Sequence, residues 1–359
     1  MKISAITLLL SSFIVCLPAK AQNTVQDILQ MQSPPLHYQV RSTHAALTID
    51  GDDQEQDWQQ APWTADFIDI QGANHSKPTY KTAVKMLWDK EHLYIFAKLE
   101  EPHIWGTLLQ HDTIIYHNND FEVFIKPNEN QDAYFEIEMN PLNTVMDLLM
   151  LKPYRYGGKA KLQWDVKGMK TAIKHVGTLN NPTDTDQYWT VEIAIPFQAL
   201  NFFGDPKSPK IGDVWRLNFS RVQWQHQIHE GRYQRVKGKE EDNWVWSPIG
   251  IVNMHLPERW GYLNFIDQQP TADFHTPTSA ALEKDLWNLH YAQGIYFQKN
   301  KKYAQSLQQL SAGNPTLNKL QAKYKIAFYT LKNYYRILLT DKNNPNNKKS
   351  IDPKGQLET

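Results

Sequence analysis

Carboxylates recur at alternating positions in two neighbouring stretches of the sequence, NDFEVFI around Glu122 and AYFEIEM around Glu136 and Glu138. Residues two apart in a strand point to the same face, so Glu136 and Glu138 are expected to share one face and Phe135 and Ile137 the other. Glu122 is expected to be their neighbour across the sheet. Carboxylate oxygens accept hydrogen bonds from hydroxyl groups, so this face could hold a hydroxylated ligand.

Aromatic side chains flank these strands and could rim the acidic face. They are Tyr116, Tyr154, Trp164 and Trp224. Aromatic rings can stack on the CH faces of pyranose rings while the carboxylates hydrogen-bond the hydroxyls. The simpler interpretation is that the carboxylates pair with Arg216, Arg221 or lysines on a solvated sheet face. Both interpretations stay open at this point.

Arg221 continues the alternation of Trp215, Leu217 and Phe219, which predicts that it points inward. A buried arginine needs a partner, and a strand glutamate is the expected one. The pair could form the floor of a ligand pocket or could tie two sheets together.

The same carboxylates suggest an enzymatic alternative. Side chains at i and i+2 on a strand lie about 6.7 Å apart at the backbone, which is close to the separation in an inverting glycosidase. Glu122 or Glu138 would then act on O-glycosyl bonds. Such pairs recur on any amphipathic strand, so no catalytic residue is assigned.

Metal motifs are weak in this sequence. His226 and His229 have no third zinc ligand in view. The acidic stretch 50–57 lacks the glycine and closing glutamate of an EF-hand, and a turn followed by a helix cap is the favoured interpretation. No metal ligand is assigned, and no phosphate-binding loop or nucleophile elbow is present.

Short strands must position these residues. In Thr82–Leu99 two runs of period two are separated by a polar break of hairpin length, and this hairpin is expected to lie in the middle of a sheet. About a dozen short strands without long intervening helices predict an all-β fold, an antiparallel β-sandwich over 39–268. A small helical region with a hairpin is expected at 278–342. The segments 269–277 and 343–359 are expected to be a linker and a frayed polar tail.

The first 21 residues are expected to be an export signal. Met1–Ala21 has a basic start, an apolar core and a small-x-small cleavage site, and 22–38 is expected to be a linker or first edge segment. Cys16, the only cysteine, lies inside this signal. The chain of 359 residues has a formal net charge of zero, which argues against a nucleic-acid partner. We therefore expect an exported, periplasmic or secreted (or cell-surface) protein without a transmembrane segment.

Ordered landmarks along about 47–265 resemble carbohydrate-binding module family 9, in the exported, free-standing type found in bacteria. They are Ile49-Asp50-Gly51, Asp57-Trp58, Leu87-Trp88-Asp89, Asn119–Ile125, Tyr188–Leu200, Trp215–Arg221 and Trp246-Ser247-Pro248 with His255–Leu263. The resemblance implies a glycan-binding β-sandwich without catalytic residues, and loops braced by structural calcium. It places the two aromatic clamp positions at Tyr116 and Met254 and the sugar-binding carboxylate at Glu122. The arginine of the family's site falls on Glu136.

The sequence thus predicts non-catalytic glycan binding in extracytoplasmic polysaccharide breakdown. The expected ligand residues are Tyr116, Glu122, Glu136, Glu138, Tyr154, Trp164, Arg221, Trp224 and Met254. The alternatives are a glycoside hydrolase, an envelope module that binds a protein partner through 278–310, and a haem-binding relative that uses Met and His.

Overall fold

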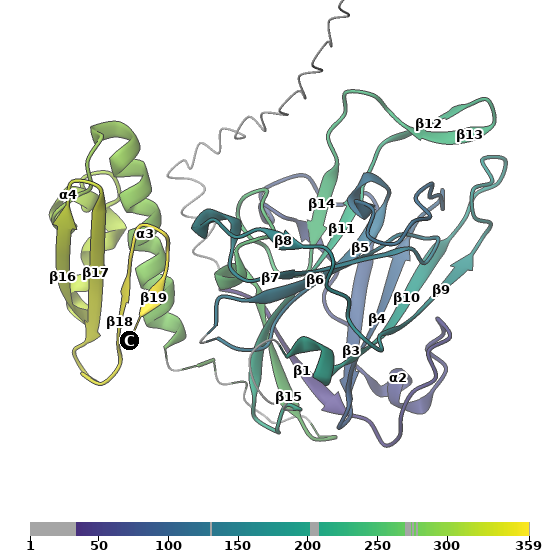
Figure 1. Ribbon diagram of the computed structural model, residues 1–359, viewed down its shortest axis with the longest axis horizontal. Helices are drawn as coiled ribbons and strands as arrows, with labels where there is room; N and C mark the ends of the chain where they lie inside the picture. The colour runs from purple at the N-terminus through teal and green to yellow at the C-terminus, as the bar shows by residue number, and fades with distance from the viewer. Residues whose placement is uncertain are drawn as a thin grey trace, which may run out of the picture.

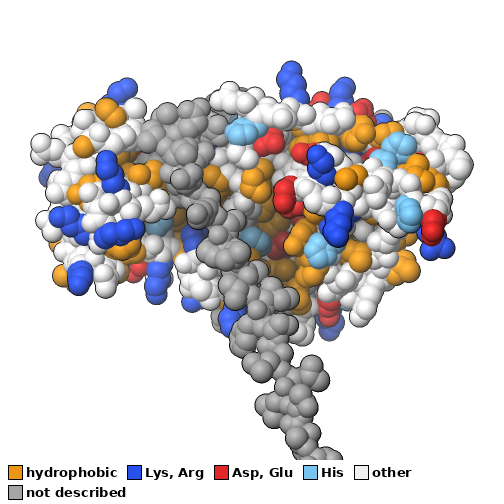
Figure 2. Space-filling view, turned by 90° about the horizontal axis from the view of Figure 1, so that it is seen from above, with side chains coloured by type: hydrophobic (Ala, Val, Ile, Leu, Met, Phe, Trp, Pro, Cys, Tyr) orange, Lys and Arg blue, Asp and Glu red, His pale blue; other side chains and the backbone are white. Residues whose placement is uncertain are grey.

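The computed structural model describes residues 34–129, 131–201, 208–269, 274, 276–277 and 279–358. The predicted signal peptide, most of the segment 22–38 and much of the linker 269–277 lie outside the described residues. Within the described ranges, no helix combines the length and the apolar character that crossing a bilayer requires. Basic side chains are scattered over the face seen in Figure 2, without gathering into one patch there.

One large mixed sheet dominates the molecule (Figure 1). Its strands run in the order β8-β7-β6-β5-β11-β15-β1-β3-β4-β10-β9, while β14 also pairs with β11 and β2 pairs with β14. They are β1 (His37–Ser42), β2 (Ile68–Asp69), β3 (Thr82–Trp88), β4 (His92–Glu100), β5 (Asp120–Lys126), β6 (Tyr134–Met139), β7 (Val145–Met150), β8 (Ala160–Lys161), β9 (Lys170–Val176), β10 (Tyr188–Pro196), β11 (Val214–Gln223), β14 (Asp242–Val245) and β15 (Gly261–Ile266). A separate hairpin pairs β12 (His226–His229) with β13 (Arg232–Arg235).

The all-β prediction is confirmed, whereas the antiparallel sandwich is not, because the sheet is mixed. Strand β1 pairs in parallel with both of its neighbours, β15 and β3. The predicted hairpin over 82–99 is present as β3 and β4, paired in antiparallel register. It lies within the sheet, between β1 and β10, as expected.

The sheet curls on itself around one apolar core, in the manner of a half-barrel. Alternate side chains of β3, β4 and β10 meet alternate side chains of β5, β6 and β11 in this core, including Met86, Ile95, Val123, Ile137 and Phe219. Because side-chain direction alternates along a strand, the remaining residues of β5 and β6 point to the opposite face. We call that opposite face of β5, β6, β7 and β11 the outer face.

A short helix packs against the sheet near the N-terminus. Helix α2 (Gln56–Gln60) buries Trp58, whose Nε1 donates to Glu192 Oε1 at 2.9 Å. The other oxygen of Glu192 accepts from the backbone N–H groups of Asp50 and Gly51, both at 2.9 Å. Gly51 has a φ of 83°, which a residue with a Cβ adopts only under strain. The acidic segment 50–57 is therefore a turn followed by a helix, as expected, although the N-cap residue Glu55 makes no side-chain hydrogen bond to the helix.

A smaller unit lies beside the large sheet (Figure 1). It contains α3 (Ala280–Asn300), α4 (Leu307–Ser311), α5 (Leu320–Lys323) and a sheet in the order β16 (Tyr324–Leu331), β17 (Tyr334–Asp341), β18 (Lys348–Ile351) and β19 (Leu357–Glu358). The expectation of a frayed end is wrong, because residues 348–358 contribute two paired strands. The domain boundaries drawn from the sequence stay predictions.

The apolar side of α3 is used within the chain. Leu282, Leu286 and Leu289 are buried in one cluster with strand residues such as Ile337 and Ile351. A contact also reaches the larger unit, where Tyr291 donates to Glu258 at 2.9 Å. The predicted envelope partner at 278–310 gains no support from this packing, since the apolar side chains that would bind it are already covered.

A candidate ligand-binding cavity

A cavity of about 380 Å³ opens on the outer face of β5, β6 and β7. Strand alternation sends Glu122 and Phe124 of β5, and Glu136 and Glu138 of β6, to this face. The walls come from loops distant in sequence. The lining residues are Ile70, Ile114, Tyr116, Glu122, Phe124, Glu136, Glu138, Met146, Leu148, Tyr154, Ala160, Leu162, Val222, Glu241, Asn243, Val252, Asn253, Met254 and His255. The cavity thus combines an acidic floor with largely apolar walls.

Three buried glutamates form the polar part of the floor. Glu122 and Glu138 are register partners, and Glu136 pairs with the next outward residue of β5, Phe124. Their exposed fractions are 5 % for Glu122, 5 % for Glu136 and 2 % for Glu138. Side chains this far from water pay a large cost for carrying charge unless they are paired.

Burial changes the protonation of these groups. It raises the pKa of Glu122 to about 7 and, together with the charge of Glu122, that of Glu136 to about 8. Burial and the neighbouring carboxylates raise the pKa of Glu138 and of the adjacent Asp120 well above their ordinary values. Protonated carboxyls are therefore present here at neutral pH. A protonated carboxyl can both donate and accept a hydrogen bond, as a hydroxyl group does.

Tyr116 stands at the rim on a short 3-10 helix, Ile115–His117. Its backbone is held from both sides. The Tyr116 N–H donates to Glu138 Oε2 at 3.0 Å, and its carbonyl accepts from Trp224 Nε1 at 2.7 Å. The Tyr116 side chain remains 39 % exposed. A buried carboxyl and a buried indole therefore position a ring that is accessible to a ligand.

Tyr154 and His255 form another part of the wall. Tyr154, which is 48 % exposed, packs edge-to-face on the His255 ring with centroids 4.5 Å apart. His255 Nδ1 shares a 2.8 Å hydrogen bond with the Tyr134 hydroxyl. Burial lowers the pKa of His255 to about 4, so its ring is neutral at neutral pH. The wall offers a second accessible aromatic ring beside an uncharged imidazole.

Six of the nine residues expected from the sequence line this cavity. They are Tyr116, Glu122, Glu136, Glu138, Tyr154 and Met254. Trp164 is not among them, because its ring lies 4.8 Å from Phe135 and packs on the inner core. Trp224 does not line the cavity either, but its indole N–H donates a hydrogen bond to the carbonyl of Tyr116, which does.

Arg221 lies on the opposite side of its strand from the cavity. Its Nη2 pairs with Glu101 Oε2 at 3.1 Å, and each side chain is 1 % exposed. A pocket-floor role would place Arg221 on the outer face, whereas the observed contacts hold it inside the core. The pairing with a buried glutamate is as expected, although Glu101 follows strand β4 rather than lying within a strand.

The alternative of a solvated, charge-paired sheet face is wrong. Arg216 pairs with Glu129 at 2.6 Å, and Arg221 with Glu101. The three floor glutamates are buried, and Glu136 Oε2 lies 3.9 Å from Nδ1 of the neutral His255 ring.

Sequence reasoning missed several polar residues of the cavity. Glu241 precedes β14 and Asn243 lies within it, and Asn253 and His255 flank Met254 in a loop. Asn253 Oδ1 accepts from the His255 N–H at 2.9 Å, which shapes this loop. Asn253 and His255 could have been found from their proximity in sequence to Met254, where the resemblance places the second clamp residue, but Glu241 and Asn243 lie 13 and 11 residues before it.

The calcium implied by the family resemblance does not fit the acidic segments. In the stretch 50–57, Asp53 pairs with Lys85, Asp52 with Lys174 and Asp57 with His44. Near the cavity, one oxygen each of Asp120, Glu122 and Glu138 lie within 4.8 Å of one another. However, Asp120 Oδ1 and Glu138 Oε2 already accept backbone N–H groups. At one ligand atom from each residue, this trio supplies three oxygens, fewer than the six to eight that Ca²⁺ prefers.

His226 and His229, which the sequence did not favour as a zinc pair, make other contacts. The His226 ring packs 4.6 Å from His103 and 5.2 Å from Tyr233, while His229 lies beside Glu230. No third metal-ligating side chain joins this pair among the described residues.

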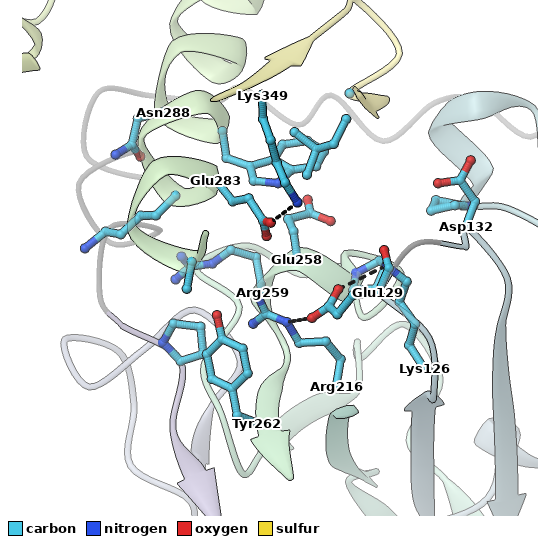
Figure 3. A pocket seen from close by; sticks show the side chains of 18 of the residues that line it. Lys126, Glu129, Asp132, Arg216, Glu258, Arg259, Tyr262, Glu283, Asn288 and Lys349 are labelled. Carbon is cyan, nitrogen blue, oxygen red and sulfur yellow. Dashed lines mark hydrogen bonds and ion pairs between the residues drawn. The ribbon is translucent and has the colours of Figure 1, made fainter. Parts of the chain in front are cut away.

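A larger cavity of about 780 Å³ lies between the two units (Figure 3). Its charged side chains pair with one another. Arg216 Nε lies 2.6 Å from Glu129 Oε1, Lys126 lies 3.3 Å from the same carboxyl, and Lys349 pairs with Glu283 (Figure 3). Such ion pairs are typical of a polar interface between two units. They leave few of the charged side chains available to a ligand. The smaller cavity is therefore the better candidate site.

Comparisons with known proteins agree with the family resemblance. Residues 49–220 match the family described as carbohydrate family 9 binding domain-like, so the resemblance is confirmed over this segment. No curated protein matches the chain.

Solved structures are similar at low identity. One is a candidate carbohydrate-binding protein from Bacteroides uniformis (16 % identity, TM-score 0.48, covering 64 % of this chain and 99 % of that one). The others are of a carbohydrate binding module family 9 protein from Caldicellulosiruptor kristjanssonii. The complex with cellotriose has 16 % identity, a TM-score of 0.42 and coverage of 68 % and 99 %. The complex with glucose has 17 % identity, a TM-score of 0.43 and coverage of 67 % and 100 %.

Proposed function

From the match of residues 49–220 to the carbohydrate family 9 binding domain-like family, we propose that this chain binds a glycan in the cavity on the outer face. The observation that carries the proposal is the convergence of Tyr116, Tyr154 and three buried glutamates on one hollow. A volume of about 380 Å³ is near the small end of ligand pockets, which favours a terminal sugar or a short oligosaccharide.

The recognition divides between stacking and hydrogen bonding. The accessible rings of Tyr116 and Tyr154 offer faces for the CH surface of a pyranose. Glu122, Glu136 and Glu138 offer hydrogen bonds to its hydroxyls, and protonated carboxyls serve as donors as well as acceptors. Tyr154 takes the part of the second aromatic clamp, because Met254 has no ring.

Binding is tested by calorimetry and affinity electrophoresis of the full chain. The panel contains xylan, mixed-linkage glucan, pectin, host-type glycans, and glucose and cellotriose as small probes. Saturable binding to at least one of them, weakened by Tyr116→Ala, is the expected result. Absence of binding across the panel, with a correctly folded protein, would reject the proposal.

Hydrolysis of O-glycosyl bonds is the second candidate. The observation that favours it is the raised pKa of Glu122, because an acid that titrates near pH 7 can protonate a leaving-group oxygen. Incubation with each bound glycan, followed by a reducing-end assay, separates the two functions. New reducing ends that Glu122→Gln or Glu138→Gln abolishes would establish the enzyme, and an unchanged glycan leaves binding alone.

We also propose that the protein is exported and serves polysaccharide breakdown outside the cytoplasm. The support is the sequence of Met1–Ala21, with its basic start, apolar core and small-x-small site. Fractionation of expressing cells with mass determination tests this. A mature form that begins at Gln22 in the periplasm or medium is expected, and an uncleaved cytoplasmic chain would contradict it.

A further inference from the structure

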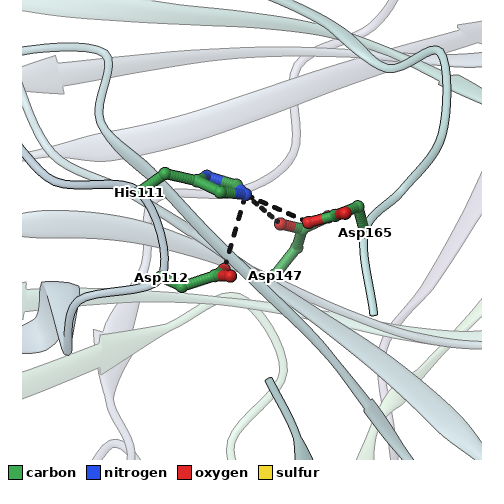
Figure 4. Close-up of side chains that lie close together, drawn as sticks. All are labelled: His111, Asp112, Asp147 and Asp165. Atoms are coloured by element: carbon green, nitrogen blue, oxygen red, sulfur yellow. Dashed lines mark hydrogen bonds and ion pairs between the residues drawn. The ribbon is translucent and has the colours of Figure 1, made fainter. Parts of the chain in front are cut away.

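A second polar cluster lies apart from the glycan cavity, on the other side of β7. It consists of His111, Asp112, Asp147 and Asp165, none of which lines the cavity (Figure 4). His111 Nε2 lies 3.1 Å from Asp165 Oδ1, 3.5 Å from Asp112 Oδ1 and 3.7 Å from Asp147 Oδ1. One ligand atom from each residue lies within 4.8 Å of the others. Figure 4 shows the three carboxylates arranged around the His111 ring nitrogen.

Asp147 gives an independent reason to place a cation here. Its side chain is 2 % exposed, and its Oδ1 points into the cluster, buried without a hydrogen-bond partner among the described residues (Figure 4). Its Oδ2 is used, since it accepts from the Val166 N–H. Asp112 Oδ1 is likewise buried and without a hydrogen-bond partner. Leaving a buried carboxylate oxygen unsatisfied is unfavourable, and a bound metal ion would satisfy it.

Three separate segments bring the ligands together. His111 and Asp112 lie in the turn before the Tyr116 helix, and the Asp112 N–H bonds to the Val145 carbonyl at 3.1 Å. Asp147 is an inward-facing residue of β7, and Asp165 follows β8. A cation at this point would join the loop that carries Tyr116 to the edge of the sheet.

We propose that these four side chains bind one Zn²⁺ ion, through His111 Nε2 and one carboxylate oxygen each of Asp112, Asp147 and Asp165. Ligand atoms of a tetrahedral zinc site lie about 3.3 Å apart, from bonds of about 2.0–2.1 Å, and the three distances from His111 bracket this value. The imidazole nitrogen selects a transition metal over Ca²⁺ and Mg²⁺, which prefer ligand sets made of oxygen alone.

The test is a zinc titration of the full chain after treatment with a chelator. Calorimetry is expected to show one tight equivalent, and Zn²⁺ is expected to raise the melting temperature. His111→Ala should weaken this equivalent at least tenfold and abolish the zinc-dependent shift. Since the His111 side chain is 54 % exposed, its loss should leave the fold intact, which circular dichroism verifies. Asp165→Asn, at a 65 % exposed side chain, is a second variant with the same expectation.

His44→Ala is the matched control. Its side chain is 62 % exposed and also pairs with an aspartate, Asp57, at 2.6 Å, but no further carboxylate joins that pair to form a metal-ligating group among the described residues. This variant should bind zinc as the unmodified chain does. The proposal is overturned if the unmodified chain binds no zinc, if His111→Ala binds it equally well, or if Ca²⁺ binds the site as tightly as Zn²⁺. None of these outcomes depends on glycan binding.

Discussion

Glu122 and Glu138 stand directly opposite each other on β5 and β6, on one face of the sheet, with exposed fractions of 5 % and 2 %. Like charges at opposed strand positions destabilise a sheet, and burial increases the cost of ionising them. The structure reduces that cost because burial raises the pKa of both carboxyls, so that they retain protons. A pair that is unfavourable for stability is understandable if the cavity binds hydroxyl groups, as proposed above.

The stability of the protein is expected to fall as the pH rises. The pKa of Glu122 is raised from 4.5 to about 7 in the folded state, so between these values the folded protein binds a proton more tightly than the unfolded chain. The contribution of Glu122 to the free energy of unfolding is therefore fully present below pH 4.5 and is lost as the pH rises through about 7. Glu122→Gln removes this loss and should stabilise the protein at pH 8 by on the order of 1–3 kcal/mol, with little effect at pH 4.5.

Denaturant unfolding at several pH values measures this effect. Glu129→Gln is the contrasting control. Although burial raises the pKa of Glu129, Arg216 and Lys126 lower it to about 2, so this variant should lose stability at neutral pH. A Glu122→Gln variant that is less stable at pH 8 than the unmodified chain would contradict the prediction.

Removal of the Tyr116 ring is expected to weaken glycan binding by on the order of tenfold, because the ring supplies the stacking surface. Tyr116→Phe keeps the ring and should bind nearly as well. Tyr329→Ala is the control, since this side chain is 60 % exposed but lies on β16 of the smaller unit. Calorimetry with the best glycan of the panel gives the comparison, and equal affinities of the two alanine variants would refute the placement of the site.

Trp224→Phe tests whether the indole acts through Tyr116. The variant removes the 2.7 Å hydrogen bond from Nε1 to the Tyr116 carbonyl but keeps an aromatic ring. We expect a loss of about 1 kcal/mol in stability, and a weaker affinity because the rim helix is less well positioned. Trp63→Phe, at a 42 % exposed tryptophan outside the cavity, should change neither quantity. If Trp224→Phe binds glycan as well as the unmodified chain, the hydrogen bond from Trp224 does not contribute to binding and the side chain serves packing only.

Arg221→Met separates the core ion pair from the binding site. The substitution leaves Glu101 buried without its partner, and breaking such a pair typically costs about 3–5 kcal/mol. The double variant Arg221→Met with Glu101→Gln should recover much of that stability. Glycan affinity of the folded fraction should stay unchanged in both, because Arg221 lies on the inner face. If the variant is folded but binds glycan more weakly, Arg221 contributes to the binding site and the prediction is wrong.

The acidic floor was predictable because the direction of a strand side chain is a local property. Alternation alone placed Glu136 and Glu138 on one face, and the register with β5 then brought Glu122 to them. The two tryptophans were harder to predict, because they lie outside the regular strands and distant contacts orient their rings. Trp164 turns to Phe135 in the core, and Trp224 turns to the carbonyl of Tyr116.

The parallel pairing of β1 with its neighbours could not be predicted from the sequence pattern either. Strand β1 begins inside 22–38, which was expected to be a linker or first edge segment, but it lies within the sheet, and its partner β15 lies at the other end of the large sheet's sequence. The polar composition of residues 348–358 hid two strands, because an edge of a small sheet needs only one apolar face. The cluster around His111 was missed because its four members come from three segments with no common spacing.

Strand β1 joins the two halves of the large sheet, since β15 and β3 each pair with it and not with one another. Ser42 at its end bonds to Asp267, 225 residues further along the chain. Strand β1 is the first strand of the large sheet and β15 its last, so the two halves can be joined only after β15 has been synthesised. Contacts between such distant parts of a chain slow folding, so the large sheet is expected to form slowly.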